Sequence, residues 1–514
     1  MSGERFSKII TASVNGLDAE VVAVETDITT GLPAYSLVGL PGSAVKESKE
    51  RVRSAIANSG YEFPLRRITV NLSPADTFKD GSHFDLPIAV GIMTCSTKEK
   101  INLPEEGKTA FFGELSLDGT LNRTAFAVAM ALGLQESGVR HIFLPEGNLR
   151  EVRELPGLLF YPAHTLGEIV LHLLGGDGIA PVRGGFRSSK KAGISVADAD
   201  DFFDVKGQEA VKRALLVACA GAHDVCLTGP PGVGKSMLAK RVPGILPPLE
   251  EYESREVTRI HSIAGENTKR SGLMYDRPFR SPHHSATQAS IIGGGLKARP
   301  GEISLAHRGV LFLDELPEFE RRTLDMLRQP LEDRYIDLSR VGFKGRYPCD
   351  FLLIAAMNPC PCGYLDDPEH VCRCNQTQIQ RYRSKLSGPL LDRIDIHVRM
   401  GAVEEAEFGP DAGRRICMST DEMRHAALAA RQRQKERNPD RILNARLSAE
   451  GMKNCCLMEK EAEEVLKKAY EHYSFSVRAR TKIIKVARTI ADIEGAKTIR
   501  ASDVAEAVAY RGVG

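Results

Sequence analysis

A glycine-rich segment of eight residues has the composition and spacing of a phosphate-binding loop. It fits the pattern G-x-x-x-x-G-K-[ST] and consists of Gly229, Pro230, Pro231, Gly232, Val233, Gly234, Lys235 and Ser236. In such a loop the backbone amides surround phosphate oxygens, the lysine reaches the outer phosphates and the hydroxyl binds Mg²⁺. An apolar strand at 225–228 precedes the segment and helix-forming residues follow it, as the motif requires. The sequence therefore predicts a site for ATP and Mg²⁺.

Two acidic residues follow a second apolar run. The run 310–313 ends in Asp314 and Glu315. A strand places such residues at the carboxyl edge of a sheet, where Asp314 helps to hold Mg²⁺ and Glu315 polarises the attacking water. Taken alone, a strand that ends in Asp-Glu is more often a solvated strand end. Because a phosphate loop precedes this pair in the same predicted domain, we interpret both residues as catalytic.

Two further polar residues are candidates for the same site. The apolar strand 351–357 ends at Asn358, which is followed by proline, and its amide is suited to orient water or to contact the outermost phosphate. The alternative is an asparagine that only turns the chain. Arg393 follows a predicted turn and is suited to stabilise transition-state charge from a neighbouring subunit. Its alternative is a salt bridge with a nearby acid.

Four cysteines gather in two Cys-x-Cys pairs, Cys360 with Cys362 and Cys372 with Cys374. Four thiolates suffice for a tetrahedral structural zinc with no open position for water. The pairs differ from the commoner Cys-x-x-Cys spacing, and reduced free cysteines are the alternative. His370 is a candidate substitute ligand, although a loop histidine is more often only solvated.

Basic residues mark a candidate DNA-contacting hairpin. The segment 334–349 is predicted to form two short strands that carry Arg340, Lys344 and Arg346. Basic side chains there could follow a phosphate backbone, and Phe343 or Tyr347 could stack on bases. The alternative is a solvated cationic turn. The stretches 279–284 and 293–297 provide flexible glycines and two histidines, which we interpret as loop polar groups and not as metal ligands.

Composition limits the classes of protein that fit. The 514 residues exceed what one hydrophobic core usually serves, so two or three domains are expected. The net charge of +2 neither supports nor excludes DNA, which must meet a local basic surface. The first residues lack the pattern of a secretory signal, and no long uncharged apolar stretch follows. We therefore expect a cytoplasmic protein without a membrane partner.

Changes in composition divide the chain into four predicted parts. Residues 1–174 combine an alternating strand at 67–72 with helical spacing at 44–59, which indicates an α/β domain. A linker rich in Gly, Ser, Lys and Asp occupies 175–200. Residues 201–415 hold the phosphate loop and, at 360–374, the cysteine cluster, and 416–514 is predicted to be helical.

The ordered segments GPPGVGKS, VLFLDE, AAMNP, SGPLLDRID and SVRA resemble the magnesium-chelatase branch of AAA+ ATPases, and in particular the bacterial YifB/ComM family. The match covers nearly the entire chain. The resemblance implies an α/β fold in which an AAA+ P-loop core carries a helical C-terminal lid. It also implies that Arg478 is a second sensor in the lid and that Arg393 acts in trans within a ring, normally a hexamer.

The N-terminal domain is similar to the proteolytic domain of Lon, through Phe78-Lys79-Asp80-Gly81 and the segment 112–119. Aligning these motifs places His83 where the nucleophilic serine should be, and Ser82 lies one position early. No lysine lies in 121–127 to activate a nucleophile. We predict that this Lon-protease-like α/β domain is a non-proteolytic platform.

The family resemblance implies a DNA helicase that promotes branch migration during homologous recombination, as in competence and natural transformation. Its partners would be single-stranded or branched DNA and further copies of the chain. The alternatives are a protein-remodelling AAA+ machine and a chelatase-type motor subunit. A chelatase motor needs neither the Lon-like domain nor the cysteines, and an unfoldase usually uses an aromatic-apolar pore loop instead of Lys344 and Arg346. These features favour a DNA motor.

Overall fold

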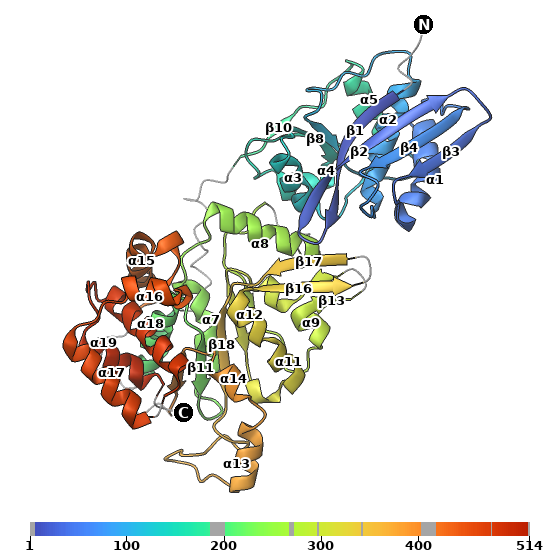
Figure 1. Cartoon of the computed structure of the whole chain (residues 1–514). Helices are drawn as coiled ribbons and strands as arrows, with labels where there is room; N and C mark the ends of the chain where they lie inside the picture. Colours follow the sequence, from blue (N-terminus) through green and yellow to red (C-terminus); the bar gives the residue numbers. More distant parts are fainter. Residues whose placement is uncertain are drawn as a thin grey trace. The chain divides into compact units, whose positions relative to one another are not determined.

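A computed structural model describes residues 6–185, 201–266, 272–295, 298–340, 343–401, 418–473 and 475–511, without the side chains of residues 339, 340, 343 and 344. The chain divides into two compact units (Figure 1). The first comprises the described parts of residues 1–192, 251–274 and 338–346, and the second comprises the described parts of the rest. Within the described residues, no helix combines the length and the apolar character that crossing a bilayer requires.

The first unit is built on an eight-stranded mixed sheet. In sheet order its strands are β10 (Val182–Arg183), β9 (Leu159–Ala163), β8 (His141–Pro145), β5 (Thr109–Phe111), β1 (Phe6–Asn15), β2 (Asp18–Thr29), β4 (Arg67–Ser73) and β3 (Ala34–Val38). Every second residue of β4 is buried, which confirms the predicted alternation. Its helices are α1 (Ser43–Asn58), α2 (Asp85–Ser96), α3 (Ala127–Glu136), α4 (Glu146–Val152), α5 (Leu166–Leu173) and α8 (Glu251–Ala264).

Helix α8 belongs to the first unit although it lies beyond the phosphate loop in the sequence. It contacts α3, and Arg259 forms an ion pair with Glu136 at the end of that helix. The carboxylate of Glu154 accepts a hydrogen bond from the backbone of Leu273 at 3.0 Å. These long-range contacts have no local sequence signal, since each joins segments more than a hundred residues apart.

The second unit has a five-stranded sheet in which every pairing is parallel. Its order is β12 (Phe279–Arg280), β15 (Val310–Leu313), β18 (Leu352–Met357), β11 (Val225–Thr228) and β19 (Ile396–Arg399). Because the strands are parallel, the residues that follow β11, β15 and β18 meet at one edge. The sequence predicted these three strands, and the structure confirms them.

Helices surround this sheet and form the C-terminal region. The helices of the second unit that precede the C-terminal group include α6 (Glu209–Gly221), α7 (Lys235–Ile245), α11 (Arg321–Met326), α12 (Arg328–Asp333), α13 (Gln376–Arg383) and α14 (Gly388–Leu391). The C-terminal helices are α15 (Thr420–Arg437), α16 (Ala449–Cys455), α17 (Lys460–Tyr473), α18 (Val477–Ile493) and α19 (Ala501–Ala509). They gather beside the sheet in orange and red (Figure 1), which confirms the predicted helical end of the chain.

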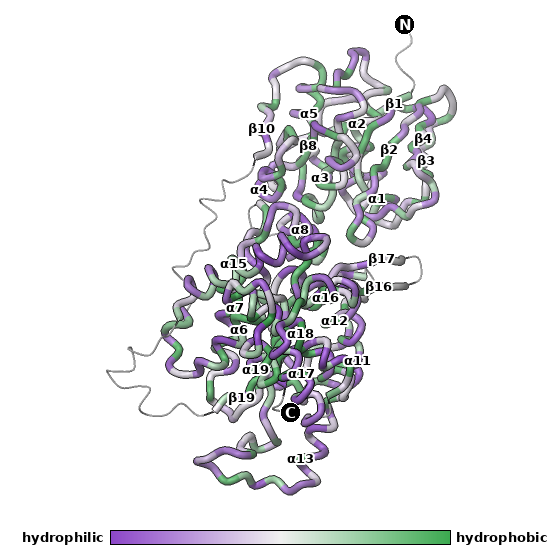
Figure 2. Tube along the Cα trace, turned by 60° about the vertical axis from the view of Figure 1, so that its left-hand side comes forward, coloured by the Kyte–Doolittle hydropathy of each residue, from purple (hydrophilic) through white to green (hydrophobic). Residues whose placement is uncertain are grey.

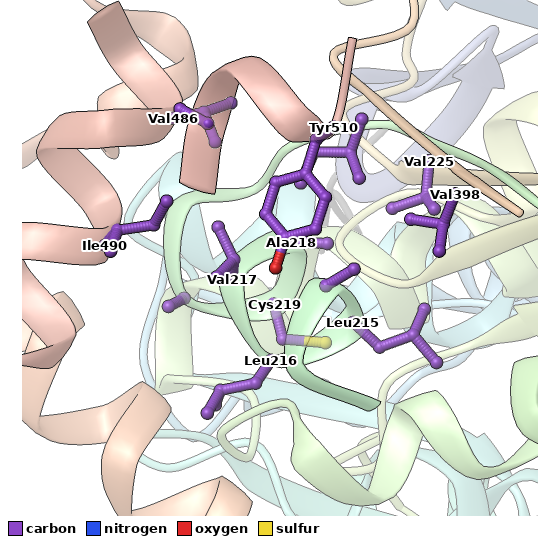
Figure 3. Packing of buried hydrophobic residues seen from close by; sticks show 14 of the residues in the cluster. Leu215, Leu216, Val217, Ala218, Cys219, Val225, Val398, Val486, Ile490 and Tyr510 are labelled. Atoms are coloured by element: carbon purple, nitrogen blue, oxygen red, sulfur yellow. The ribbon is translucent and has the colours of Figure 1, made fainter. Parts of the chain in front are cut away.

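One hydrophobic core joins the sheet to the C-terminal helices. Figure 3 shows side chains of this core from α6 (Leu215 and Val217), β11 (Val225) and α18 (Ile490), together with Tyr510. Hydrophobic segments, green in Figure 2, recur along the strands and helices of both units. The C-terminal helices are therefore packed onto the sheet and not only tethered to it.

A candidate nucleotide site and a four-cysteine loop

The phosphate loop lies between β11 and α7, as its motif requires. Gly232 and Gly234 have φ values of 82° and 90°, which side-chain-bearing residues rarely adopt. A Cβ on Gly229 would lie 2.7 Å from the carbonyl oxygen of Met400. The glycines at these positions are therefore required by the shape of the loop itself.

Lys235 is buried at the mouth of this loop, with 8% of its surface exposed. Its Nζ donates to the carbonyl oxygens of Gly229 at 2.7 Å and Pro230 at 2.8 Å, and to Oδ1 of Asn358 at 3.0 Å. Burial lowers the pKa of the amine, although the nearby Asp314 and Glu315 oppose this. The three partners are neutral oxygens, and anionic phosphate oxygens would be stronger acceptors.

Ser236 and Asp314 form a pair suited to a hard cation. The hydroxyl of Ser236 donates to Oδ2 of Asp314 at 2.6 Å, across two elements that lie far apart in the sequence. A hydroxyl and a carboxylate at the edge of a parallel sheet are oxygen ligands of the kind that Mg²⁺ prefers. The residues predicted for Mg²⁺ therefore lie together and fit the ion chemically.

Glu315 adopts a left-handed backbone conformation, with φ 51°, directly after Asp314. Its carboxylate lies 3.3 Å from Nδ1 of His284 and is 57% exposed. The ring of His284 lies 4.0 Å from that of His283. This pairing was not predicted from the sequence. The signal was that β12, which precedes the histidines, pairs in parallel with β15, a contact visible only once the strand order is known.

Asn358 leaves the end of β18 and hydrogen-bonds to Lys235, so the structure joins the predicted sensor to the phosphate loop. Its backbone N–H also hydrogen-bonds to the hydroxyl of Tyr382 in α13. Burial raises the pKa of that hydroxyl to about 12, so it stays protonated. Asn358 is therefore held from two sides.

Arg393 is engaged away from the phosphate loop. It pairs with Glu332 of α12 at 2.8 Å and donates to the carbonyl oxygen of Pro389 at 2.8 Å. This is the salt bridge that the sequence analysis left as the alternative. Arg478 lies exposed in the first turn of α18 and joins none of the hydrogen bonds of the phosphate loop described above. The structure therefore brings together five of the predicted catalytic and metal-binding residues but neither arginine.

The segment that carries Arg393 is tied to α18 by a buried polar network. Lys482 donates to the carbonyl oxygen of Arg393 and to Oδ1 of Asp395. Asp395 also pairs at 2.8 Å with His223, whose other ring nitrogen lies 2.8 Å from the hydroxyl of Thr489. Burial alone would raise the pKa of Asp395, but Lys482 and His223 outweigh it and lower the pKa well below its usual range.

The four cysteines lie together, with all four sulfurs within 4.8 Å of one another. Cys360 Sγ lies 3.3 Å from Cys362 Sγ and 3.7 Å from Cys372 Sγ, and the latter two are 3.6 Å apart. Zn–S bonds of about 2.3 Å in a tetrahedron give sulfur separations of about 3.8 Å. The donor set and its spacing therefore fit a closed zinc site. His370 pairs with Asp367 at 3.2 Å and is not part of this cluster.

The thiols of this cluster differ in acidity. A hydrogen bond from the backbone N–H of Tyr364 is the main reason that the pKa of Cys362 is lowered to about 6. Desolvation is the main reason that the pKa of Cys374 is raised to about 12. One thiol thus ionises well before another, and a cation would favour ionisation of all four.

The basic hairpin is formed by β16 (Tyr335–Arg340) and β17 (Phe343–Pro348), as predicted. Arg346 is exposed, whereas the side chains of Arg340, Phe343 and Lys344 lie outside the described part. Tyr347 is 1% exposed and donates to the carbonyl oxygen of Ala298 at 2.9 Å. Its expected role in stacking on bases is therefore wrong, because the ring lies in the core. Residues 296 and 297 of the glycine-containing stretch 293–297 also lie outside the described residues.

In the first unit, the position compared with the Lon nucleophile is occupied by a buried histidine. His83 lies 2.9 Å from the carbonyl oxygen of Ala12, and burial lowers its pKa to about 4. Ser82 donates to the carboxylate of Glu114, and buried Lys79 donates to the carbonyl oxygens of Pro74 and Thr77. A carboxylate is therefore the partner of this serine hydroxyl.

Three family models match the chain. They are described as "Magnesium chelatase, subunit ChlI" over residues 201–408, "Subunit ChlI of Mg-chelatase" over residues 24–148 and "Magnesium chelatase, subunit ChlI C-terminal" over residues 417–511. The first of these covers the phosphate loop, both acids, Asn358 and the four cysteines.

Several relatives are similar over nearly their whole length. Protein YifB of Salmonella typhimurium is 41% identical over 503 residues, which cover 98% of this chain and 96% of that protein. Competence protein ComM of Haemophilus influenzae is 38% identical over 496 residues, which cover 96% and 95%. The magnesium-chelatase 67 kDa subunit of Heliobacterium mobile is 28% identical over 231 residues, which cover 40% and 31%. The likeness to YifB and ComM thus extends through both units, whereas the chelatase subunit matches a part.

Proposed function

Because the chain belongs to the YifB/ComM family of magnesium-chelatase-like AAA+ proteins, we propose that it is a ring-forming ATPase that moves along DNA. The observation that carries the ATPase activity is the convergence of Lys235, Ser236, Asp314 and Asn358 through direct hydrogen bonds at one edge of the sheet. ATP and Mg²⁺ are the ligands that the family implies, and this edge has donors and acceptors for both.

Each of these residues has a proposed task in hydrolysis. The loop amides and Lys235 bind the phosphates, and Asn358 keeps the lysine oriented through its 3.0 Å hydrogen bond. Ser236 and Asp314 would hold Mg²⁺, which neutralises charge that develops on the phosphate oxygens. Glu315 accepts a proton from the attacking water, and His284 holds its carboxylate in place until then.

Two arginines complete the proposed machinery. Arg393 would stabilise transition-state charge at the site of a neighbouring subunit, and Arg478 would contact nucleotide from the lid. Arg393 pairs with Glu332 and is not directed at its own phosphate loop, so a role in hydrolysis would require it to leave this pair and act in trans. A ring, normally a hexamer in this resemblance, would supply the neighbour.

Two observations support the proposal that the motor moves along DNA: the name of a relative and the basic residues of the hairpin. A relative covering nearly all of the chain is named a competence protein, and the hairpin carries Arg340, Lys344 and Arg346 on two adjacent strands. We infer a helicase that promotes branch migration during homologous recombination or natural transformation. The four cysteines would hold one structural zinc in each chain.

The test compares ATP hydrolysis and strand exchange on the same preparations. We expect hydrolysis to rise with single-stranded or forked DNA, and a three-strand substrate to be resolved by the wild type but not by Glu315→Gln.

Replacing Lys344 and Arg346 with Ala should weaken DNA binding while basal hydrolysis survives. The slope of log affinity against log salt concentration should become shallower by about 0.7 for each lost contact to single-stranded DNA. A wild type that hydrolyses ATP, moves no strand and remodels a protein substrate would replace the DNA motor with an unfoldase.

A further inference from the structure

The four-cysteine loop begins directly at the nucleotide site. Asn358, which hydrogen-bonds to Lys235, is separated from Cys360 by a single proline. Cys360 is fully buried, and its carbonyl oxygen accepts a hydrogen bond from the backbone of Gly363 at 3.0 Å. A change in the position of this cysteine is therefore transmitted to Asn358 through two peptide units.

A second contact joins the same loop to the phosphate loop itself. A Cβ placed on Gly363 would lie 2.4 Å from Cδ of Pro231, so the backbone of Gly363 packs directly on that proline ring. Gly363 has a φ of 87° and is the one buried residue in 361–375, all of which the structure describes. The one buried residue of segment 361–375, Gly363, therefore packs against the phosphate loop at Pro231.

A third set of contacts connects the C-terminal end of the cysteine loop to Asn358 through α13. Asn375, the residue after Cys374, caps α13 by accepting from the backbone of Gln378 at 2.8 Å. The same helix carries Tyr382, whose hydroxyl hydrogen-bonds to the backbone of Asn358. Figure 1 shows α13 and the loop before it at one extremity of the second unit, where Arg399 of β19 contacts the loop through an ion pair with Asp366 at 3.4 Å.

The two ends of the loop meet at its four cysteines, since all four sulfurs lie within 4.8 Å of one another. Its exposed residues include Val371 at 87% exposure, and it buries too little apolar surface to order itself. A metal that binds four thiolates supplies that order. The shape it imposes then determines where Gly363 meets Pro231 and where Asn358 meets Lys235.

We propose that metal binding at the four cysteines and nucleotide binding at the phosphate loop are thermodynamically coupled, so that each ligand strengthens the binding of the other. The proposal rests on the proposed zinc and ATP sites but not on DNA as the track. Coupling of this kind is reciprocal, and typical values are about 5- to 150-fold in affinity. In this proposal, metal bound at the cysteine loop fixes the position of Asn358 beside Lys235.

The primary experiment measures the coupling in the full-length wild type. Zinc affinity is determined by competition with a chromophoric chelator of known affinity, with and without Mg²⁺ and a non-hydrolysable ATP analogue. We expect zinc to bind at least about fivefold more tightly with nucleotide, and zinc-loaded protein to bind nucleotide more tightly by the same factor. A change below about twofold in protein that binds both ligands would overturn the proposal.

A variant locates the coupling at Gly363. Asparagine tolerates a positive φ better than other residues with a side chain, so Gly363→Asn mainly adds the clash with Pro231. It should keep one zinc per chain but lose most of the coupling. Gly107→Asn is the matched control, since Gly107 has a φ of 75° and nothing within 4 Å of the added Cβ.

The outcomes separate this inference from the proposed function. Full coupling in Gly363→Asn would overturn the route through Pro231. Protein purified under reducing conditions without chelator that holds no zinc would overturn both the metal site and its coupling. DNA-stimulated ATP hydrolysis would stand in either case, because Lys235, Asp314 and Glu315 do not contact the cysteines.

Discussion

The two halves of the proposed catalytic machinery are built differently. In the first half, two hydrogen-bonded pairs, Lys235 with Asn358 and Ser236 with Asp314, lie at the edge of one parallel sheet within a single chain. In the second half, Arg393 is held by Glu332 and Pro389, and Arg478 lies exposed at the start of α18. One half is assembled by the fold of the subunit, and the other half is not.

This difference follows from the elements that carry the residues. Parallel strands end at one edge, so residues that follow them converge whatever their separation in sequence. The arginines sit on a turn and on a helix start, which no sheet edge aligns. They are nevertheless linked to each other, because Lys482 of α18 binds both the carbonyl oxygen of Arg393 and the carboxylate of Asp395. In the proposed mechanism, this linked second half would act as one body at the nucleotide site of a neighbouring subunit.

The largest expected effects separate two residues of the first half. Lys235→Ala should abolish nucleotide binding, because the ammonium is buried in the loop that would surround the phosphates. Glu315→Gln should keep nucleotide affinity and lose about 10²-fold or more in hydrolysis, because only the proton acceptor is changed. Fluorescent-nucleotide titration and steady-state hydrolysis measure the two. Equal loss of affinity in both variants would contradict the separate roles.

The next effect tests whether the second half acts across a subunit boundary. Arg393→Ala should bind ATP normally and lose about 10³-fold in hydrolysis, the lower end of the range for such arginines. Mixing it with Lys235→Ala should restore part of the activity, because some sites then combine an intact phosphate loop with an intact arginine. Rings that exchange subunits without any recovery would show that Arg393 serves its own chain.

The residues of the first half could be predicted from the sequence because each is marked by a motif within one short segment. The phosphate loop is a contiguous motif, and the acids and Asn358 each end an apolar strand, so the parallel fold alone brings them together. The four cysteines were likewise found from spacing within fifteen residues. Each prediction needed one segment and the general rule that parallel strands share an edge.

The remaining contacts depend on packing that no single segment encodes. The pair of His284 and Glu315 requires β12 beside β15, and that of Gly363 and Pro231 joins residues from two loops. Tyr347 was expected to face DNA because aromatic residues in basic hairpins often do, yet its ring fills the core. Whether a side chain on a strand faces the core or the solvent depends on the register with elements that lie far away in sequence.

A smaller effect is expected when the contacts of Lys482 that join α18 to the segment of Arg393 are removed. Lys482→Met leaves the carboxylate of Asp395 hydrogen-bonded to His223 but without its lysine, and it should lower the free energy of unfolding by about 2 kcal/mol. This is below the usual loss for a fully buried pair because Lys482 is 20% exposed. Denaturant unfolding measures the loss, with Lys468→Met on the exposed face of α17 as the control. A stability unchanged relative to this control would show that Lys482 does not hold the two arginine-bearing segments together.

The smallest effect concerns the ion pair that holds Arg393 within its own subunit. Glu332 is 50% exposed and Arg393 is 15% exposed, and because ion pairs open to solvent are worth about 0.2–1 kcal/mol, releasing the arginine should cost little free energy. If Arg393 must leave Glu332 to reach a neighbouring phosphate, Glu332→Gln removes that cost from the transition state. Hydrolysis per subunit at saturating ATP should then rise, by at most about fivefold.

The matched control for this variant is Glu318→Gln, which changes a glutamate of similar exposure, removes its ion pair with Lys385 and leaves Arg393 untouched. It should not change hydrolysis. The sign of the effect in Glu332→Gln decides between two uses of the ion pair. A rise shows that Glu332 restrains an arginine destined for another subunit. A fall approaching that of Arg393→Ala would show the reverse, that Glu332 positions the arginine for catalysis, and the two halves would then already be assembled within one chain.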